Sequence, residues 1–137
     1  MKKLIMSSLL IVLFGMMLLS QNGSAALNAS VVRGKKIYNQ YCLTCHQADG
    51  GGVPRMNPPL IQTEYVLGNK QRLIGIVLNG MNQPLEINDE TYENPMASHA
   101  FLKDEQIADV LTYVRNTFGN KASMILPAEV KAVRTKK

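Results

Sequence analysis

The chain has 137 residues, of which 15 are Lys or Arg and 10 are Asp or Glu, and its formal net charge is +5. This length suits one domain. Its basic residues are not interleaved with aromatic residues in a stripe, which argues against nucleic-acid binding.

The first predicted element is a secretory signal peptide over residues 1–26. Two lysines precede an apolar stretch from Leu9 to Leu19, and small residues follow up to Ala26. The stretch is short for a transmembrane helix, which needs about 20 residues. We therefore expect cleavage after Ala26 and a periplasmic protein, with an uncleaved N-terminal anchor as the alternative. Cleavage removes two lysines and no acidic residue, so the remaining domain, 27–137, has 111 residues and a net charge of +3.

The first predicted helix of this domain extends from Ser30, a suitable N-cap, to Cys45. It runs into the motif Cys42-Leu43-Thr44-Cys45-His46. Positions i, i+3 and i+4 share one helical face, so both thiols and the imidazole can point at the same flat ligand. This pattern is typical of c-type haem attachment, in which the thiols add to the haem vinyl groups and the histidine binds the iron.

Three other interpretations of this motif explain less. A redox-active Cys-x-x-Cys pair is expected in a βαβ setting, and no such setting is predicted around residues 42–46. A zinc site would need His99 as a remote fourth ligand. A disulfide between residues three apart would close a very small loop and add little stability. Haem c, attached at Cys42 and Cys45 with His46 on the iron, is therefore the predicted cofactor.

The middle of the chain predicts a loop, a helix and a second loop. Glycines and prolines rule out regular structure from Asp49 to Leu60. Residues 69–79 carry apolar side chains at helical spacing and end at Gly80, a helix stop. Residues 81–100 contain prolines and show no helical period. They predict a long ordered loop or a short hairpin, and long loops in compact domains are usually functional.

The last predicted helix has the clearest period, with a core face formed by Ile107, Val110, Leu111, Val114 and Phe118. Asp109, Arg115 and Asn116 are expected to face away from the core, and Gly119 ends the helix. Beyond it, basic residues gather at the C-terminus and predict a solvated tail; they are Lys131, Arg134, Lys136 and Lys137.

Taken in order, residues 30–120 resemble a class I cytochrome c. The segment Gly34–Tyr38 resembles the first helix of that family, in which Gly34 would allow close approach of the last helix. Pro58-Pro59-Leu60 resembles the loop on the histidine side of the haem. By that resemblance the carbonyl of Pro58 accepts the Nδ1 proton of His46 and raises the basicity of the ring toward iron. The resemblance implies an all-α cytochrome c fold, with three to five helices around one covalent haem.

The sixth iron ligand is sought among the four methionines that follow residue 26, which are Met56, Met81, Met96 and Met124. Met56 follows His46 too closely to cross the haem plane, and Met124 lies beyond the last helix. In the resembling family the ligand follows a tyrosine and an asparagine-containing turn, and Tyr92-Glu93-Asn94-Pro95-Met96 matches this arrangement. Met96 is therefore the predicted ligand.

Met81 and His99 remain alternative ligands. The family usually has proline directly after the ligand methionine, whereas this chain has Ala97. Methionine is a flexible gap-filler, so we interpret Met81 as loop packing. We interpret His99 as a surface or hydrogen-bonded histidine, and Tyr92 as packing more than as a contact to a haem propionate.

An iron with both axial positions filled disfavours small substrates, so the predicted function is electron transfer without catalysis. The expected partners are redox proteins: a dehydrogenase donor and an oxidase or another cytochrome as acceptor. Residues 104–120 and 127–130 are similar to cytochromes associated with sugar or alcohol dehydrogenases. That similarity makes a cytochrome subunit of a periplasmic dehydrogenase complex the alternative function. A haem enzyme or gas sensor with an open iron position is a third possibility.

Overall fold

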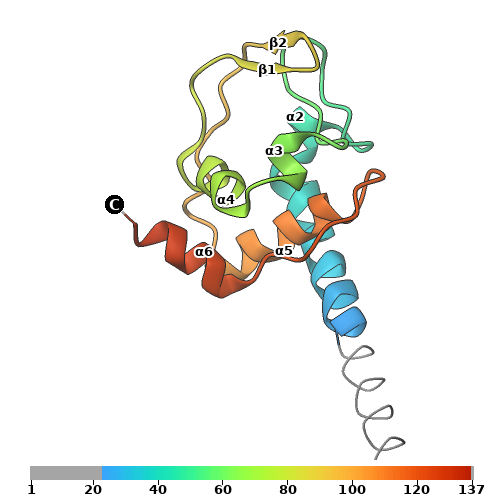
Figure 1. The fold of residues 1–137 in the computed structure, drawn as a ribbon, viewed down its shortest axis with the longest axis vertical. Helices are drawn as coiled ribbons and strands as arrows, with labels where there is room; N and C mark the ends of the chain where they lie inside the picture. The colour runs from blue at the N-terminus through green and yellow to red at the C-terminus, as the bar shows by residue number, and fades with distance from the viewer. Residues whose placement is uncertain (1–22, 137) are drawn as a thin grey trace, which may run out of the picture.

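The N-terminal part of the chain is helical in the computed structural model, which describes residues 23–136. A helix over residues 23–41 is followed, after a turn at Cys42, by the short helix α2 (Leu43–His46). The sequence predicted a start at Ser30, but helical structure is already present at residue 23. Alanines at 25, 26 and 29 favour this extension because alanine has the highest helix propensity. The helix projects from the body of the molecule (Figure 1).

The predicted signal peptide lies mostly outside the described residues, because residues 1–22 are not described. The helix passes through the expected cleavage position after Ala26 without a break, and residues 23–26 are exposed. Within residues 23–136, no helix combines the length and the apolar character that a membrane span requires. Cleavage after Ala26 stays a prediction.

Two helices follow the glycine- and proline-rich loop. Helix α3 (Glu64–Leu67) begins at Thr63, whose side chain accepts a hydrogen bond from the amide of Val66. Helix α4 (Lys70–Asn79) begins at Asn69, whose side chain accepts from the amide of Arg72, and it ends at Gly80. The predicted helix over residues 69–79 is thus confirmed, whereas the single turn of α3 was not predicted.

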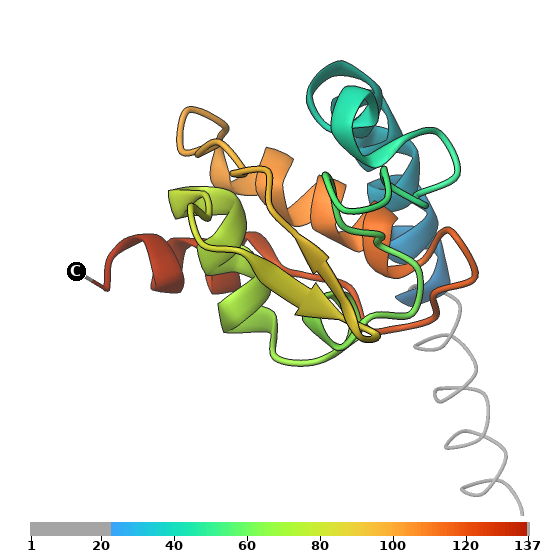
Figure 2. The same cartoon turned by 90° about the horizontal axis from the view of Figure 1, so that it is seen from above.

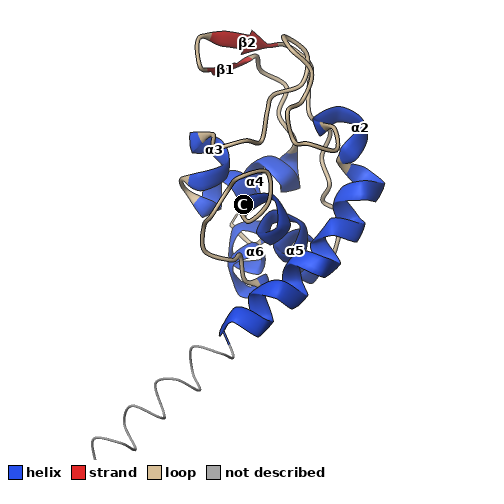
Figure 3. Cartoon of the chain, turned by 90° about the vertical axis from the view of Figure 1, so that its right-hand side faces the viewer, coloured by secondary structure: helices blue, strands red, loops and turns tan. Residues whose placement is uncertain are grey.

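A short antiparallel hairpin occupies the long loop between α4 and the last predicted helix. Strands β1 (Leu85–Ile87) and β2 (Glu90–Tyr92) pair with Leu85 opposite Tyr92. The turn residues Asn88 and Asp89 have φ angles of 52° and 62°, a conformation that these two residue types tolerate well. The hairpin alternative of the prediction is confirmed, and Figure 3 shows the strands at one end of a body made of helices and loops. In Figure 2 the chain runs through the hairpin from α4 to α5.

Helix α5 (Asp104–Arg115) lies at the centre of the described structure. Of the apolar face predicted for it, Ile107, Val110, Leu111 and Val114 are buried, but α5 ends at Arg115, so the predicted stop at Gly119 was wrong and the partly buried Phe118 lies beyond the helix. Asp109 and Arg115 are buried as well, with exposed fractions of 8% and 3%. Their prediction as solvent-facing residues was wrong, because other segments enclose α5 on more than one side. Asp109 accepts hydrogen bonds from Ser30 (2.7 Å) and Arg33 (2.6 Å), and Arg115 donates to the carbonyl of Ser123 (3.0 Å).

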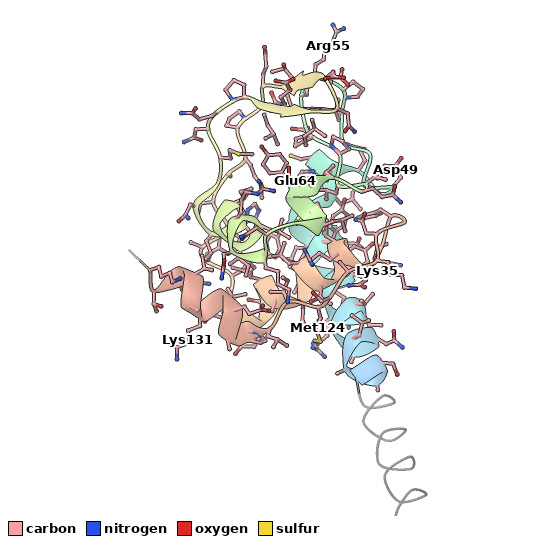
Figure 4. The ribbon with its side chains drawn as sticks, in the orientation of Figure 1. Lys35, Asp49, Arg55, Glu64, Met124 and Lys131 are labelled. Atoms are coloured by element: carbon pink, nitrogen blue, oxygen red, sulfur yellow. The ribbon has the colours of Figure 1, made fainter. Side chains whose placement is uncertain are left out.

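The predicted basic tail is largely helical. Helix α6 (Pro127–Arg134) packs on α4 and α5, and Pro127 occupies its first turn, where a missing N–H costs nothing. Arg134 is not free in solvent: it donates to Asp104 (2.7 Å) and to the carbonyl of Leu102 (2.8 Å). The expectation of a solvated tail therefore fails for this helix, although the side chain of Lys131 points outward (Figure 4).

The N-terminal helix crosses α5 at a glycine. A Cβ atom built at Gly34 would overlap the carbonyl of Asp109 and lie 2.7 Å from Cβ of Tyr113. Beside this crossing, the ring of Tyr38 lies 5.2 Å from that of Tyr113 and 5.4 Å from that of Phe118, measured between centroids. The close approach expected at Gly34 is present, and it fixes the end of the helix that carries the cysteines.

Candidate functional site

The Cys-x-x-Cys-His motif forms a single helical turn at the junction of the N-terminal helix and α2. The amides of Cys45 and His46 donate to the carbonyl of Cys42, at 3.2 and 2.9 Å. Cys42 is half-buried, Cys45 is exposed, and the two are not joined by a disulfide. All three side chains border one cavity. The structure therefore brings together the three groups that the motif was expected to present on one face.

This cavity has a volume of about 310 Å³ and lies between α2, α4, α5 and the hairpin. Its walls are mostly apolar, and Leu85 and Ile87 of the hairpin close the side opposite the helices. The apolar lining includes Leu60, Val66, Leu73, Val77, Leu102, Val110, Leu111 and Val114. Such a space suits a large flat apolar group and excludes bulk water.

His46 faces this cavity with one ring nitrogen already engaged. Its Nδ1 lies 3.0 Å from the carbonyl oxygen of Pro58. Because a carbonyl only accepts hydrogen bonds, Nδ1 carries the proton and Nε2 retains its lone pair. Burial lowers the pKa of His46, and the hydrogen bond to Pro58 opposes this effect. A neutral imidazole with an unprotonated Nε2 is the form that binds a metal ion.

The loop that carries Pro58 is held at both ends. The amide of Gly52 donates to the carbonyl of His46 (3.1 Å), and the amide of Leu60 donates to that of Gly50 (2.8 Å). On the far side, the buried side chain of Asn120 donates to the carbonyl of Leu60 (2.8 Å). The position of the Pro58 carbonyl is therefore determined by backbone contacts and by one residue that follows α5.

Among the four methionines of the described chain, two border the cavity, Met81 and Met96. Met56 is 49% exposed and lies outside the lining, and Figure 4 shows Met124 at the end of the molecule away from the hairpin. Met96 packs against the main helical core, whereas Met81 packs against the hairpin cluster of Leu85, Ile87 and Tyr92. Both methionines therefore border the cavity that His46 faces, and each contacts a different apolar cluster.

The other two residues considered from the sequence have local partners. His99 also borders the cavity, and its Nδ1 lies 2.9 Å from the carbonyl of Ala97. Tyr92 belongs to the hairpin cluster and lies outside the cavity lining, which agrees with its interpretation as packing. In the part of the chain that the structure describes, no group of three or more His, Cys, Asp or Glu side chains is placed to hold a metal ion. This leaves the zinc interpretation without support.

Sequence reasoning missed several residues of the site. Tyr41, Tyr65, Leu85 and Ile87 all border the cavity. The alternation Leu85-Glu86-Ile87 is a weak strand signal that could have indicated an apolar wall. Nothing in the sequence around Asn120 pointed to its contact with the Pro58 loop.

The donor set fits a haem: two thiols and an imidazole on one helical turn, a thioether on the opposite loop, and apolar walls between them. The family model for cytochrome c matches residues 31–118, which include all of these groups. The chain belongs to the cytochrome c family. Its cofactor is covalently bound haem c, and this cytochrome is an electron carrier.

Known relatives of this cytochrome fall into two groups. It is 36% identical to cytochrome c-552 of Thermus thermophilus, over 76% of this chain and 86% of the relative. It is 34% identical to the cytochrome c subunit of a quinone-dependent alcohol dehydrogenase from Gluconacetobacter polyoxogenes, and 31% identical to the fructose dehydrogenase cytochrome subunit of Gluconobacter japonicus. These alignments cover 82% and 74% of this chain but only 25% and 22% of the subunits.

Proposed function

We propose that Cys42 and Cys45 hold the haem through thioether bonds, that His46 and Met96 are the axial iron ligands, and that the protein carries electrons between redox proteins in the periplasm. The observation that carries the proposal is the convergence of these four side chains on one apolar cavity. The cysteines are the only two in the sequence, so no other pair can form the attachment.

The bound haem supplies an iron that exchanges one electron between its ferric and ferrous states. The protein contributes the iron ligands and the apolar walls of the site. Nε2 of His46, oriented by the Pro58 carbonyl, and the sulfur of Met96 would hold the haem iron and would thereby exclude small exogenous ligands. A methionine sulfur also favours the ferrous state and raises the potential relative to a second histidine.

The apolar walls and the backbone bonds that hold both ligand loops favour one geometry in the two oxidation states. Cys45 is exposed, whereas Cys42 is half-buried. The edge of the site nearest Cys45 is therefore the place where an electron can enter or leave without crossing the core.

The ligand assignment is tested by comparing Met96→Ala with Met81→Ala, two methionines that border the same cavity. Met96→Ala should keep the haem covalently attached, lower the reduction potential and allow carbon monoxide to bind the reduced protein. Met81→Ala should keep the wild-type potential and stay closed to carbon monoxide. The reverse result would assign the ligand to Met81. Carbon monoxide binding by the wild type would point instead to a haem enzyme or gas sensor.

The attachment is tested by extraction with acidic organic solvent, which removes only non-covalent haem. Haem should stay with the wild-type polypeptide, should load less completely in Cys42→Ala and Cys45→Ala, which each keep one thiol, and should become extractable, or be absent, when both cysteines are replaced by alanine. A wild-type protein that released all of its haem would contradict the thioether assignment.

Export is part of the proposal. Bacterial c-type cytochromes are typically extracytoplasmic, and the basic, apolar and small-residue segments of residues 1–26 support a cleaved signal peptide. The intact mass of protein from the periplasmic fraction should correspond to residues 27–137 plus one covalently attached haem. Full-length protein in the membrane fraction would indicate an uncleaved anchor.

A second candidate function is that of a cytochrome subunit in a sugar or alcohol dehydrogenase complex. It is favoured by the similarity to cytochrome subunits of alcohol, fructose and gluconate dehydrogenases. Since this chain spans about a quarter of the alcohol dehydrogenase subunit's length, a free carrier is the first choice. Stable co-purification with a flavin or quinoprotein dehydrogenase would favour the subunit.

A further inference from the structure

Two aromatic side chains meet at the mouth of the cavity from distant parts of the sequence. Tyr41 ends the N-terminal helix, one residue before Cys42, and Phe101 lies in the loop before α5. Their ring centroids are 5.4 Å apart in an edge-on arrangement, and the ring of His99 lies 5.8 Å from that of Phe101. Because Tyr41 and His99 also border the cavity, this pair belongs to its rim.

Phe101 is unusually exposed for its size. Its exposed fraction is 65%, the largest among the exposed large hydrophobic residues of the described chain, and that of Tyr41 is 37%. Single exposed apolar residues are common on protein surfaces. Here, however, Tyr41 borders the same cavity as Cys45, the exposed cysteine of the attachment motif, where an electron can reach the surface.

The two segments that form this rim contain no Asp, Glu, Lys or Arg. Residues 37–48 run without such a residue between Lys36 and Asp49, and residues 94–102 run without one between Glu93 and Lys103. The charge nearest Phe101 is that of Arg134, which donates to the carbonyls of Ala100 and Leu102 but is paired with Asp104 at 2.7 Å. Lys35, Arg55 and Lys131 point outward from the N-terminal helix, the hairpin end and α6 (Figure 4). A partner with a strongly acidic or basic docking face would find no complementary charge in these two segments.

We propose that the rim formed by Tyr41, Cys45, His99 and Phe101 docks an uncharged, apolar face of a redox partner protein, with Phe101 as the central contact. This inference rests on the proposed function, because it places the partner over the exposed edge of the haem site. Exposed aromatic residues contribute large contact areas at interfaces. Redox encounters bury little surface, so one aromatic contact can carry a large share of the attraction.

Electron self-exchange between ferric and ferrous copies of the holoprotein provides the test, since a second copy offers a face of the required chemistry. NMR line broadening in mixtures of the two states measures its rate. Between about 10 mM and about 500 mM salt, the wild-type rate should change less than about threefold, because little charge needs screening at the contact. Phe101→Lys should slow electron self-exchange about tenfold at low salt. The rate should recover as added salt screens the repulsion between the new lysines of the two copies.

The matched control is Val32→Lys, because Val32 is 62% exposed and lies on the N-terminal helix away from the rim residues. It adds the same charge and should leave the rate within about twofold of wild type. Phe101→Ser, which removes apolar area without adding charge, should also slow exchange, at all salt concentrations. Both Phe101 variants should keep the wild-type haem spectrum and potential, since the side chain is largely exposed.

Several outcomes would overturn the proposal. One is equal rates in Phe101→Lys and Val32→Lys, and another is a wild-type rate that rises steeply with salt. Phe101-dependent binding to neutral phosphatidylcholine vesicles would assign the rim to a membrane. A stable dimer in sedimentation, lost in Phe101→Ser, would assign it to a second copy. Protein that lacked covalent haem would instead contradict the proposed function itself.

Discussion

Met81 and Met96 exchange two backbone hydrogen bonds: the amide of Met81 donates to the carbonyl of Met96 (2.9 Å), and the amide of Met96 donates to that of Met81 (2.8 Å). The same loop is fixed by Ser98, whose hydroxyl donates to the carbonyl of Leu78 (2.5 Å). The end of α4 therefore sets the position of the proposed ligand through the main chain.

The first prediction concerns Gly80, which separates α4 from this backbone pair. Its φ is +74°, and a Cβ atom there would overlap the carbonyl oxygen of Met96 and lie 2.9 Å from the amide of Ser98. Gly80→Ala should displace Met96, lower the reduction potential and weaken the long-wavelength absorption of methionine-ligated ferric haem. The strained backbone should also cost about 1–3 kcal/mol of unfolding free energy.

The control for Gly80→Ala lies in the same helix. A Cβ atom at Gly75 would have no atom within 4 Å. Gly75→Ala should leave spectrum and potential unchanged and stabilise the protein by about 0.5–1 kcal/mol, because alanine loses less backbone entropy in a helix. A Gly80→Ala protein with wild-type potential would show that Met96 is not held as described, or that it is not the ligand.

The second prediction concerns the histidine side. Gly52 has a φ of +68°, and a Cβ atom there would overlap the carbonyl of Asn57 and lie 2.7 Å from the carbonyl oxygen of Pro58. Gly52→Ala should move the Pro58 carbonyl away from Nδ1 of His46. The ring then becomes a weaker donor to iron, so the ferric state loses stabilisation and the reduction potential rises.

Gly51→Ala is the matched control for Gly52→Ala. Its new Cβ would meet only the carboxylate of Asp49, at 3.2 Å and beyond. That side chain is exposed and, within the described chain, accepts a hydrogen bond only from the amide of Gly51 (2.9 Å), so it can shift without disturbing the Pro58 carbonyl. The potential of Gly51→Ala should equal that of the wild type. If both variants gave the wild-type potential, the contact between His46 and Pro58 would have no influence on the iron.

The sequence predicted best those features that depend on neighbouring residues. The haem motif needs three side chains within one helical turn, the middle and last helices carry their own apolar period, and the middle helix also carries its end signal. Burial of Asp109 could not be foreseen, because its partners Ser30 and Arg33 lie 79 and 76 positions away. The stop at Gly80 was predicted from α4 alone, whereas its contact with Met96 exists only in the folded chain.

Helix α6 was missed although its sequence carries helix signals. Pro127 and Glu129 lie in its first turn and Lys131 and Arg134 in its last turn, but the basic composition of the segment was given more weight in the prediction. Its position depends on contacts with distant residues, such as those of Arg134 with Asp104 and of Glu129 with Lys70. A basic composition at a chain end predicts a solvated tail, and these tertiary partners distinguish the two outcomes.

The third prediction concerns Asn120, which joins the end of α5 to the histidine-side loop. Its side chain donates to the carbonyls of Leu60 and Val114, each at 2.8 Å, and accepts from the amide of Gln62 at 2.7 Å. Asn120→Ala should lower the free energy of unfolding by about 1–3 kcal/mol, because buried backbone groups lose their hydrogen-bond partners. In a domain of this size, each kcal/mol of unfolding free energy that is lost lowers the melting temperature by about 4–8 °C.

Gln62→Ala is the control for Asn120→Ala, because the exposed Gln62 side chain makes only a 3.4 Å contact to the carbonyl of Gly119. Its backbone amide still donates to Asn120 after the change. The free energy of unfolding of Gln62→Ala, measured by thermal unfolding, should stay within about 0.5 kcal/mol of the wild-type value. Equal stability of the two variants would mean that Asn120 does not fix the loop.

The fourth prediction concerns pH and the attachment of α6. Glu129 accepts from the amide of Leu126 (2.7 Å) and from Nζ of Lys70 (3.0 Å). Burial by itself raises the pKa of Glu129, but these contacts outweigh it and hold the pKa below its usual value. The unfolded chain, with a glutamate pKa of about 4.3, therefore binds the proton more readily, and the contribution of Glu129 is lost as pH falls through the folded-state pKa.

Glu129→Gln should therefore be less stable than the wild type by about 0.5–1 kcal/mol at neutral pH, a value that allows for solvent screening of this half-buried pair. The difference should shrink as pH falls below about 4.3, as measured by urea unfolding of the holoprotein at several pH values. Glu64→Gln is the control, because Glu64 is 79% exposed in its ion pair with Arg72 and should change stability little at any pH. A constant difference between Glu129→Gln and the wild type from neutral to acidic pH would show that the carboxylate charge does not hold α6 against α4.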